Sequence, residues 1–183
     1  MTTPDEPGAS ESIRDAPAFY EIERRYLVRV APAVRARLGQ GTELRQGYLR
    51  HGQPSVRIRF GEPRGPVLTC KSGSGVRRRE VETVVPEPVA EALWEAAGDH
   101  TVAKVRHRIG PWELDRFSGA LEGLTLLEIE LADEDDPVPP APEGISILGE
   151  VTDVKGFTSG HLASLTPRDA RAFVVEAYRS FGP

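Results

Sequence analysis

Three pairs of glutamates recur along the chain, each with a single residue between the two carboxylates. Alternate side chains of a β-strand point to the same face, so in a strand each pair would present its carboxylates side by side. Carboxylate oxygens are hard ligands that suit Mg²⁺ or Mn²⁺, and each pair is therefore a candidate set of metal ligands. The pairs are Glu21/Glu23, Glu80/Glu82 and Glu128/Glu130.

Basic residues occupy strand-like segments with a similar alternation. Arginine makes forked contacts with phosphoryl oxygens, and lysine supplies a compact point charge. Bases gathered on one face of a sheet would therefore suit a ligand with several phosphoryl groups. The bases in question are Arg57, Arg59, Lys71, Arg78, Lys104 and Arg106.

The segments that carry these charges alternate charged and apolar residues, and turns rich in Gly, Pro or Ser separate them. This pattern predicts about eight β-strands and a mostly β fold, either a barrel or a sandwich, decorated with helices. Helical spacing is found at 32–38, 88–97 and 166–178, and an acidic, proline-rich loop is expected at 133–144. The predicted strands are 19–30, 43–50, 55–61, 67–72, 78–85, 101–109, 112–117 and 124–132.

The alternation of charged and apolar residues has two interpretations. An antiparallel sheet that packs one face on a core and exposes the other to water shows the same pattern. However, the charged faces mix acids with bases and contain few Ser, Thr, Asn or Gln. The other interpretation is a closed barrel with the charged face inward, where eight strands enclose room for side chains or one small ligand. The charges would then have to be paired, and their repetition on strand after strand favours this tunnel.

Length and composition set further bounds. A chain of 183 residues suffices for one medium domain, and a formal net charge of −5 gives no support to a nucleic-acid binder. The single cysteine, Cys70, excludes an intramolecular disulfide and suits a reducing cytoplasm. No apolar run reaches the roughly 18 residues of a membrane span. Residues 1–17 are rich in Pro, Ser and acids and are predicted to be a disordered leader to a single domain at 18–183.

The stretch EIERRYLV, from Glu21 to Val28, resembles the signature strand of the CYTH superfamily, the triphosphate tunnel metalloenzymes, whose motif is E-x-E-x-K. The resemblance extends in order over about residues 19–165, nearly everything but the leader and the last helix. The further blocks that are similar to successive strands of bacterial members are QGYL (46–49), VRIR (56–59), LTCKS (68–72), RREVE (78–82), KVR (104–106), WELDRF (112–117), TLLEIEL (125–131) and LGEVTD (148–153).

The resemblance implies an eight-stranded antiparallel β-barrel tunnel, with helices packed outside, that hydrolyses triphosphate compounds with Mg²⁺ or Mn²⁺. Glu21, Glu23 and Arg25 would be the catalytic strand, with the two glutamates holding one metal and orienting the attacking water. Glu128 and Glu130 would hold the metal that bridges the phosphates. The six bases named above would bind the triphosphate, and the supporting acids would be Glu80, Glu82 and Asp115.

Superfamily members include inorganic tripolyphosphatases, thiamine triphosphatases, RNA triphosphatases and class IV adenylyl cyclases. The expected activity is hydrolysis of inorganic tripolyphosphate or of a small organic or nucleoside triphosphate. Adenylyl cyclase activity, and binding of polyphosphate or nucleotide without turnover, are the alternatives. The expected partner is a triphosphate-containing small molecule, with no nucleic acid and no membrane, and the chain is expected to be a monomer or a homodimer.

The sequence departs from the family pattern in the catalytic strand and again toward the C-terminal end of the chain. Arg25 stands where the motif has Lys, and a planar guanidinium that does not readily deprotonate is not equivalent to an ammonium at a tight site. The stretch VTDVKGFTSG lacks the usual basic-Tyr-x-Asn cluster, and Lys155 is its nearest base. The stretch GEVT, at 149–152, is one residue shorter than the corresponding stretch expected from the family pattern, which contains two acidic residues. These departures bear on rate and substrate preference.

Overall fold

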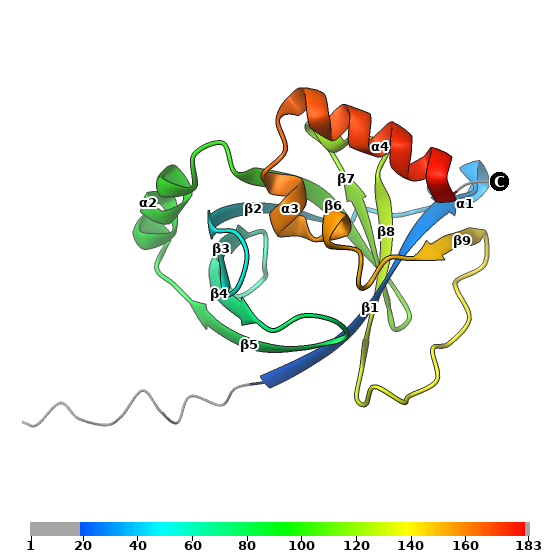
Figure 1. The fold of residues 1–183 in the computed structure, drawn as a ribbon, viewed down its shortest axis with the longest axis horizontal. Helices are drawn as coiled ribbons and strands as arrows, with labels where there is room; N and C mark the ends of the chain where they lie inside the picture. The colour runs from blue at the N-terminus through cyan, green and yellow to red at the C-terminus, as the bar shows by residue number, and fades with distance from the viewer. Residues whose placement is uncertain (1–18, 182–183) are drawn as a thin grey trace, which may run out of the picture.

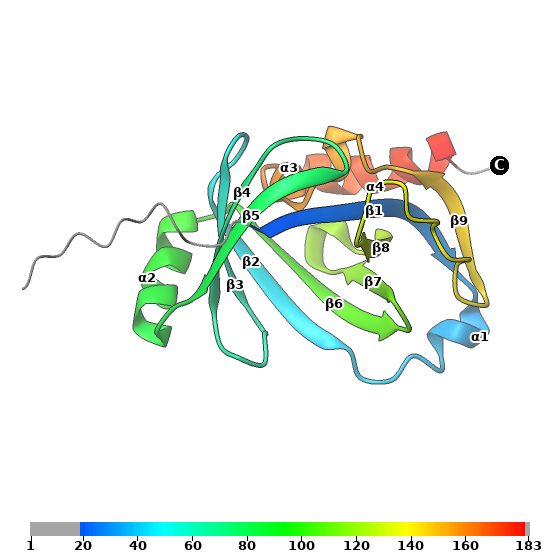
Figure 2. The ribbon, with the colours of Figure 1, turned by 90° about the horizontal axis from the view of Figure 1, so that it is seen from below.

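The fold is a closed antiparallel barrel. The structure, a computed structural model, describes residues 19–181, and the predicted leader lies outside the described residues. The sheet has the strand order β5-β4-β3-β2-β6-β7-β8-β1-β9, and β1 also pairs with β5. That extra pairing closes eight strands into a barrel and leaves β9 outside it (Figure 1, Figure 2). The predicted eight-stranded antiparallel barrel is therefore confirmed.

The eight barrel strands coincide with the eight predicted ones to within one or two residues at each end. They are β1 (Phe19–Val30), β2 (Thr42–Arg50), β3 (Ser55–Phe60), β4 (Val67–Ser72), β5 (Arg77–Val84), β6 (Thr101–Ile109), β7 (Trp112–Phe117) and β8 (Thr125–Leu131).

The ninth strand, β9 (Ile145–Glu150), was not among the predicted strands. It follows a proline-rich loop and contains Gly149, so its sequence shows little strand periodicity. It forms because β1 is longer than the barrel needs, and the end of β1 pairs with β9 across an irregularity between Leu27 and Val28. Gly149 is required there, because a Cβ at this position would lie 2.5 Å from the ring of Phe181.

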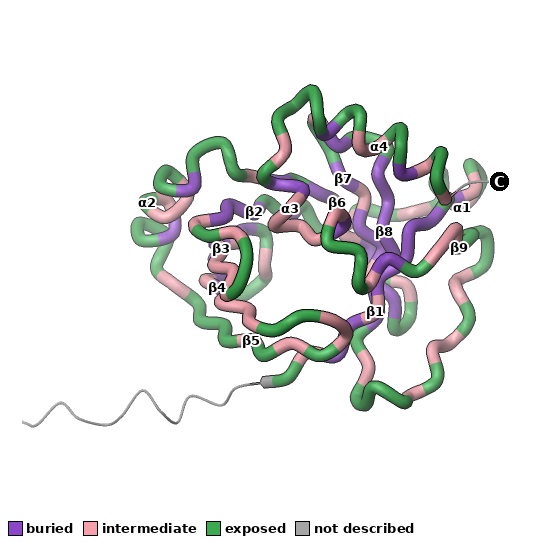
Figure 3. The backbone as a smooth tube through the Cα atoms, in the orientation of Figure 1, coloured by how far each residue is buried: buried purple, intermediate pink, exposed green. Residues whose placement is uncertain are grey.

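Helix α2 covers an outer, apolar face of the barrel, whereas α4 packs against inward apolar residues of the strands. Helix α2 packs Ala90 against Ile58 and Phe60, and α4 packs Ala170 and Ala177 into a larger cluster on the other side of the barrel. Figure 3 shows the buried residues concentrated where β1, β7 and β8 meet the cover of α4. Sequence analysis predicted α2 and α4 closely, whereas it made α1 too long and missed α3. The helices are α1 (Pro32–Arg35), α2 (Glu87–Ala97), α3 (Ser159–Ala163) and α4 (Pro167–Phe181), with 3₁₀ turns at Gly119–Leu121 and Lys155–Phe157.

The inward residues of four strands change from charged to apolar. We call the four apolar residues the tunnel floor. All four are buried in one cluster with Phe157 and Leu162, which belong to the segment around α3. The charged part of the barrel interior therefore ends at the floor, on the side of the segment around α3. Each floor residue lies two positions beyond an inward charged residue of its own strand, and the four are Leu27, Val102, Phe117 and Leu126.

No helix among residues 19–181 is both long enough and apolar enough to cross a membrane.

The turn after β3 depends on Gly61. Its φ is +99°, and a Cβ would lie 1.9 Å from the carbonyl oxygen of Glu43 on the neighbouring strand. We therefore expect Gly61→Ala to lower the free energy of unfolding by about 2 kcal/mol or more, measured by urea denaturation. Gly39→Ala is the matched control, since nothing lies within 4 Å of a Cβ there. An equal effect of the two substitutions would contradict this account of the turn.

Candidate active site in the barrel tunnel

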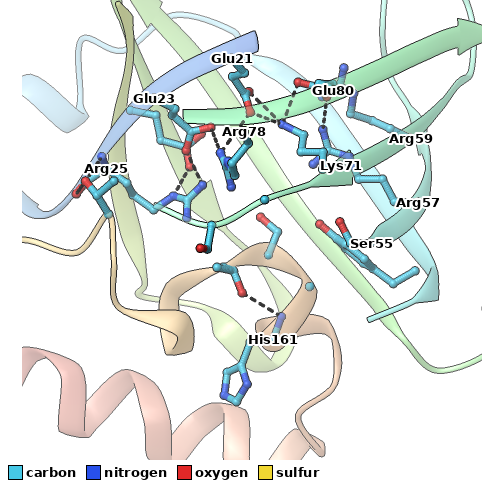
Figure 4. A pocket seen from close by; sticks show the side chains of 18 of the residues that line it. Glu21, Glu23, Arg25, Ser55, Arg57, Arg59, Lys71, Arg78, Glu80 and His161 are labelled. Atoms are coloured by element: carbon cyan, nitrogen blue, oxygen red, sulfur yellow. Dashed lines mark hydrogen bonds and ion pairs between the residues drawn. The ribbon is translucent and has the colours of Figure 1, made fainter. Parts of the chain in front are cut away.

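The charged faces of the strands line a single cavity inside the barrel. The cavity has a volume of about 1080 Å³. Figure 4 shows side chains of β1, β3, β4 and β5 pointing into it and toward one another. The tunnel interpretation is thus the correct one, and the solvated open face is excluded. Of the predicted site residues, Asp115 alone does not line the cavity. The residues that do line it are Glu21, Glu23, Arg25, Arg57, Arg59, Lys71, Arg78, Glu80, Glu82, Lys104, Arg106, Glu128 and Glu130.

Arg25 forms the centre of a buried ion-pair cluster. Its Nε donates to Glu128 Oε1 at 2.5 Å, and an Nη atom contacts Glu23 Oε1. The second oxygen of Glu23 accepts from Arg78 at 2.7 Å, and that of Glu128 accepts from Arg106 at 2.8 Å. Burial opposes the charge of Arg25, yet the carboxylates of Glu23 and Glu128 raise its pKa. The motif arginine is therefore a fixed cation whose fork spans β1 and β8.

Lys71 is the centre of a second cluster, toward the other end of β1. Its Nζ lies 2.7 Å from Glu21 Oε2 and 3.0 Å from Glu80 Oε2. Arg78 also approaches Glu21, at 3.1 Å. Burial of Glu21 works against its charge, but Lys71 and Arg78 lower the pKa of Glu21 to about 2. Glu21 is therefore ionised throughout the physiological range.

Glu80 is held differently from Glu21, although both contact Lys71. Burial raises the pKa of Glu80 to about 7. The nearby carboxylate of Glu21 and a hydrogen bond with Glu82 also raise this pKa, whereas the ammonium of Lys71 lowers it. Protonated and ionised forms of Glu80 therefore coexist near neutral pH.

Arg57 has the loosest ion pairs of the tunnel bases. Its nearest carboxylate oxygens, on Glu80 and Glu82, lie 3.9 and 4.0 Å away. Its Nε is buried and has no hydrogen-bond partner, and the same is true of Arg78 Nε. A buried guanidinium donor without a partner is costly unless a ligand satisfies it. Arg57 and Arg78 line a cavity that could admit an anion, so their guanidinium groups are suited to phosphoryl oxygens.

Asp115 lies behind the cavity wall. It is fully buried and contacts Lys104 and Arg106, the latter through two hydrogen bonds of 2.6 Å. Asp115 therefore holds two of the substrate-binding candidates in position, which is a more specific role than the sequence indicated.

The residues present fit a divalent cation only with help from a ligand. Among the described residues, no three His, Cys, Asp or Glu side chains form a group that could hold a metal. Mg²⁺ is commonly held by one or two carboxylates together with substrate phosphates and water. Glu130 suits that mode, because it faces the tunnel and has no ion pair within the described part of the chain. Partial burial and the carboxylates of Glu21, Glu113 and Glu23 raise its pKa, as expected where a cation is needed.

The segment that departs from the family pattern forms part of the tunnel wall. Lys155 lines the cavity, and the carbonyl of Phe157 accepts a 3.4 Å hydrogen bond from Arg25. The hydroxyl oxygen of Thr152 accepts a 3.0 Å hydrogen bond from the backbone N–H of Arg25. This segment therefore supports Arg25, which the sequence did not indicate because residues more than 120 positions apart meet only after barrel closure.

Sequence analysis also missed wall residues that are not Asp, Glu, Lys or Arg. Tyr48 and His51 line the cavity beside the 51–54 turn, and His51 Nδ1 lies 3.0 Å from the carbonyl of Gly160. Gln53 bonds the backbone of Gly73, joining two turns next to the tunnel. The alternating-charge signal could not find these residues, because they belong to turns or to apolar-looking positions.

The buried charge cluster behind the wall generates a prediction about stability. Asp115→Asn leaves Lys104 and Arg106 without their shared carboxylate, so we expect the free energy of unfolding to fall by about 3–5 kcal/mol. Glu91→Gln is the control, because it breaks a half-exposed pair with Arg45 and should cost at most about 1 kcal/mol. Urea denaturation of both variants makes the comparison, and a small loss for Asp115→Asn would show that the cluster is not tightly held.

Glu80 generates a prediction about pH. Its folded-state pKa is raised above the value of 4.5 expected in the unfolded chain. The folded protein therefore binds more protons between these two values, and the contribution of Glu80 to stability is lost as pH rises through about 7. We expect the Glu80→Gln variant to lose less stability than the natural protein between about pH 5 and 8, measured by urea denaturation. Parallel stability curves for the two proteins would contradict the raised pKa.

Comparison with known proteins agrees with this geometry. No family model matches the chain. The chain is 33% identical over 157 residues to an inorganic triphosphatase of Nitrosomonas europaea, covering 80% of this chain and 99% of that protein. It is also 33% identical over 120 residues to an inorganic triphosphatase of Acetivibrio thermocellus, covering 62% and 76% respectively.

A solved crystal structure of an inorganic triphosphatase superposes on the barrel with a TM-score of 0.53 at 31% identity, covering 80% of this chain and 96% of that one. The ordered tunnel motifs, the closed barrel and relatives matched over nearly their full length lead to one assignment. The chain belongs to the CYTH superfamily.

Proposed function

We propose that this protein hydrolyses inorganic tripolyphosphate, or a small molecule that carries a triphosphate, inside the tunnel with the help of Mg²⁺ or Mn²⁺. The observation that supports this most strongly is the set of arginines and lysines that line the cavity, above all Arg57, whose nearest carboxylate oxygen lies 3.9 Å away and whose Nε has no hydrogen-bond partner. Two relatives named as inorganic triphosphatases support the choice of an inorganic substrate.

The bases of the tunnel would bind the phosphate chain. Arg57 can turn from its distant carboxylates to phosphoryl oxygens at little cost, and Lys71 can share its three donors between Glu21 and a phosphate. Arg106 lines the cavity and is anchored there by Asp115, Glu113 and Glu128. Donors held in place before the substrate arrives stabilise charge that develops on the transferred phosphoryl group and on the leaving group.

Carboxylates of the tunnel would hold the cation and the water. Glu130 and Glu21 are the candidates to contact a metal together with the substrate phosphates. A bound Mg²⁺ or Mn²⁺ would supply Lewis-acid stabilisation of phosphoryl oxygens and lower the pKa of a coordinated water. Glu21, ionised across the physiological range, can accept a hydrogen bond from that water and orient it. The chain's free thiol, Cys70, is compatible with a cytoplasmic location, which we also propose.

Phosphate release from tripolyphosphate, ATP and thiamine triphosphate tests the proposal. We expect release from tripolyphosphate with Mg²⁺ or Mn²⁺ and none in EDTA. Arg57→Gln should lower kcat/KM by about 10²–10³-fold, the usual cost of removing a preorganised donor. Arg79→Gln is the matched control, because Arg79 lies on the exposed face of β5 and should change kcat/KM by less than about twofold.

Three outcomes would contradict the proposal. Formation of cyclic AMP and diphosphate from ATP would make the protein a cyclase. Tight binding of tripolyphosphate without turnover under either metal would make it a binding module. Equal activity of the Arg57→Gln and Arg79→Gln variants would place the reaction outside the tunnel.

A further inference from the structure

The motif arginine occupies a position where a cation is required. Glu23 Oε1 and Glu128 Oε1 come from different strands and converge on the same guanidinium of Arg25. The second oxygens of these glutamates are taken by Arg78 and Arg106. All four oxygens are therefore bound to guanidinium groups, and a metal could reach them only by displacing at least one of these.

The guanidinium of Arg25 is held too firmly to give way easily. Arg25 is 6% exposed, and its remaining Nη atom donates to the carbonyl of Phe157 at 3.4 Å. Its backbone N–H is held by Thr152 in turn. Its planar fork spans both carboxylates, whereas a lysine at this position would be a point charge. Next along β1 and β8 lie Leu27 and Leu126 of the tunnel floor, both buried, so the neighbours of this ion-pair cluster on that side are apolar.

The outer members of the two carboxylate pairs differ from the inner ones. Glu130 faces the tunnel on β8, lies opposite Glu23 in the strand register and has no ion pair among residues 19–181. Glu21 contacts the guanidinium of Arg78 at 3.1 Å and the ammonium of Lys71 through both oxygens, and the flexible Lys71 can move to a phosphate. Of the four glutamates of these two pairs, Glu130 is thus the one without an ion pair among residues 19–181, and it lies at this outer level.

We infer that Arg25 replaces a metal ion at the inner position, so that the tunnel holds one divalent cation, on the side of Glu130 and Glu21, instead of two. This inference rests on the metal dependence in the proposed function. It assigns the departure from the motif lysine a specific role, which is to reduce the number of metals that the site binds and to fix that number by the side chain itself.

Native mass spectrometry of the full chain with Mn²⁺ and imidotriphosphate, a non-hydrolysable analogue of tripolyphosphate, counts the bound ions directly. The natural protein should carry one Mn²⁺ in its complex. Arg25→Ala should carry two, because Glu23 and Glu128 then face each other without their shared cation. Arg24→Ala is the matched control, since Arg24 is the adjacent residue on the outer face, paired with Glu150, and it should still carry one.

A second variant keeps the test decisive even if Arg25→Ala does not fold. Glu130→Gln should weaken Mn²⁺ binding by at least about tenfold, the effect of losing a metal-contacting carboxylate. Two Mn²⁺ in the natural protein, or one Mn²⁺ in a folded Arg25→Ala variant, would overturn the inference. The ion count does not depend on turnover. A protein that binds one Mn²⁺ but releases no phosphate would refute the proposed hydrolysis alone, and one that binds two and hydrolyses would refute this inference alone.

Discussion

Enclosing a charged side chain in a barrel removes it from water at a cost of several kcal/mol, unless an opposite charge goes with it. The tunnel contains acids and bases on facing strands, and most of them are paired across strand boundaries, as with Arg25 and Glu128 or Lys71 and Glu21. Those pairs form only when β1 meets β5 and β8. Closure of the barrel and neutralisation of its interior are therefore one requirement. The apolar outer faces, under α2 and around Tyr26, Trp112 and Leu127, supply part of the hydrophobic core, and α4 packs against the tunnel floor to supply the rest.

The ion pairs differ in how firmly they are held, and this difference relates the structure to function. Near the tunnel floor, Asp115 and Arg25 are fully enclosed and hold their partners permanently. Farther from the floor, Arg57 keeps its carboxylates at about 4 Å and Glu130 has no ion pair within the described chain. The inner charges position the outer ones, and the outer ones remain available to a polyanion and its cation. A site of this kind needs no reorganisation when charge develops on a phosphoryl group.

The sequence predicted the strands and the charged residues well, because each depends on local alternation. Glu21 and Glu23, for example, share a face in any strand that contains them. Alternation in one strand left open whether that face was solvated, whereas its repetition on strand after strand, with acids and bases mixed, favoured the tunnel. Strand β9 and helix α3 were missed, because they form by packing against β1 and the tunnel wall instead of by their own periodicity. The partners of Arg25 could not be predicted either, since Thr152 and Phe157 reach it across more than 120 residues.

The central claim is that the bases of the tunnel exchange wall carboxylates for phosphates when substrate enters. A crystal structure of the protein with imidotriphosphate and Mg²⁺ tests this most directly. The account predicts the phosphate chain inside the cavity, with the guanidinium of Arg57 within hydrogen-bonding distance of phosphoryl oxygens and the ion pairs of Asp115 unchanged. An analogue bound on the outer surface, or inside the tunnel without a contact to Arg57, would contradict it.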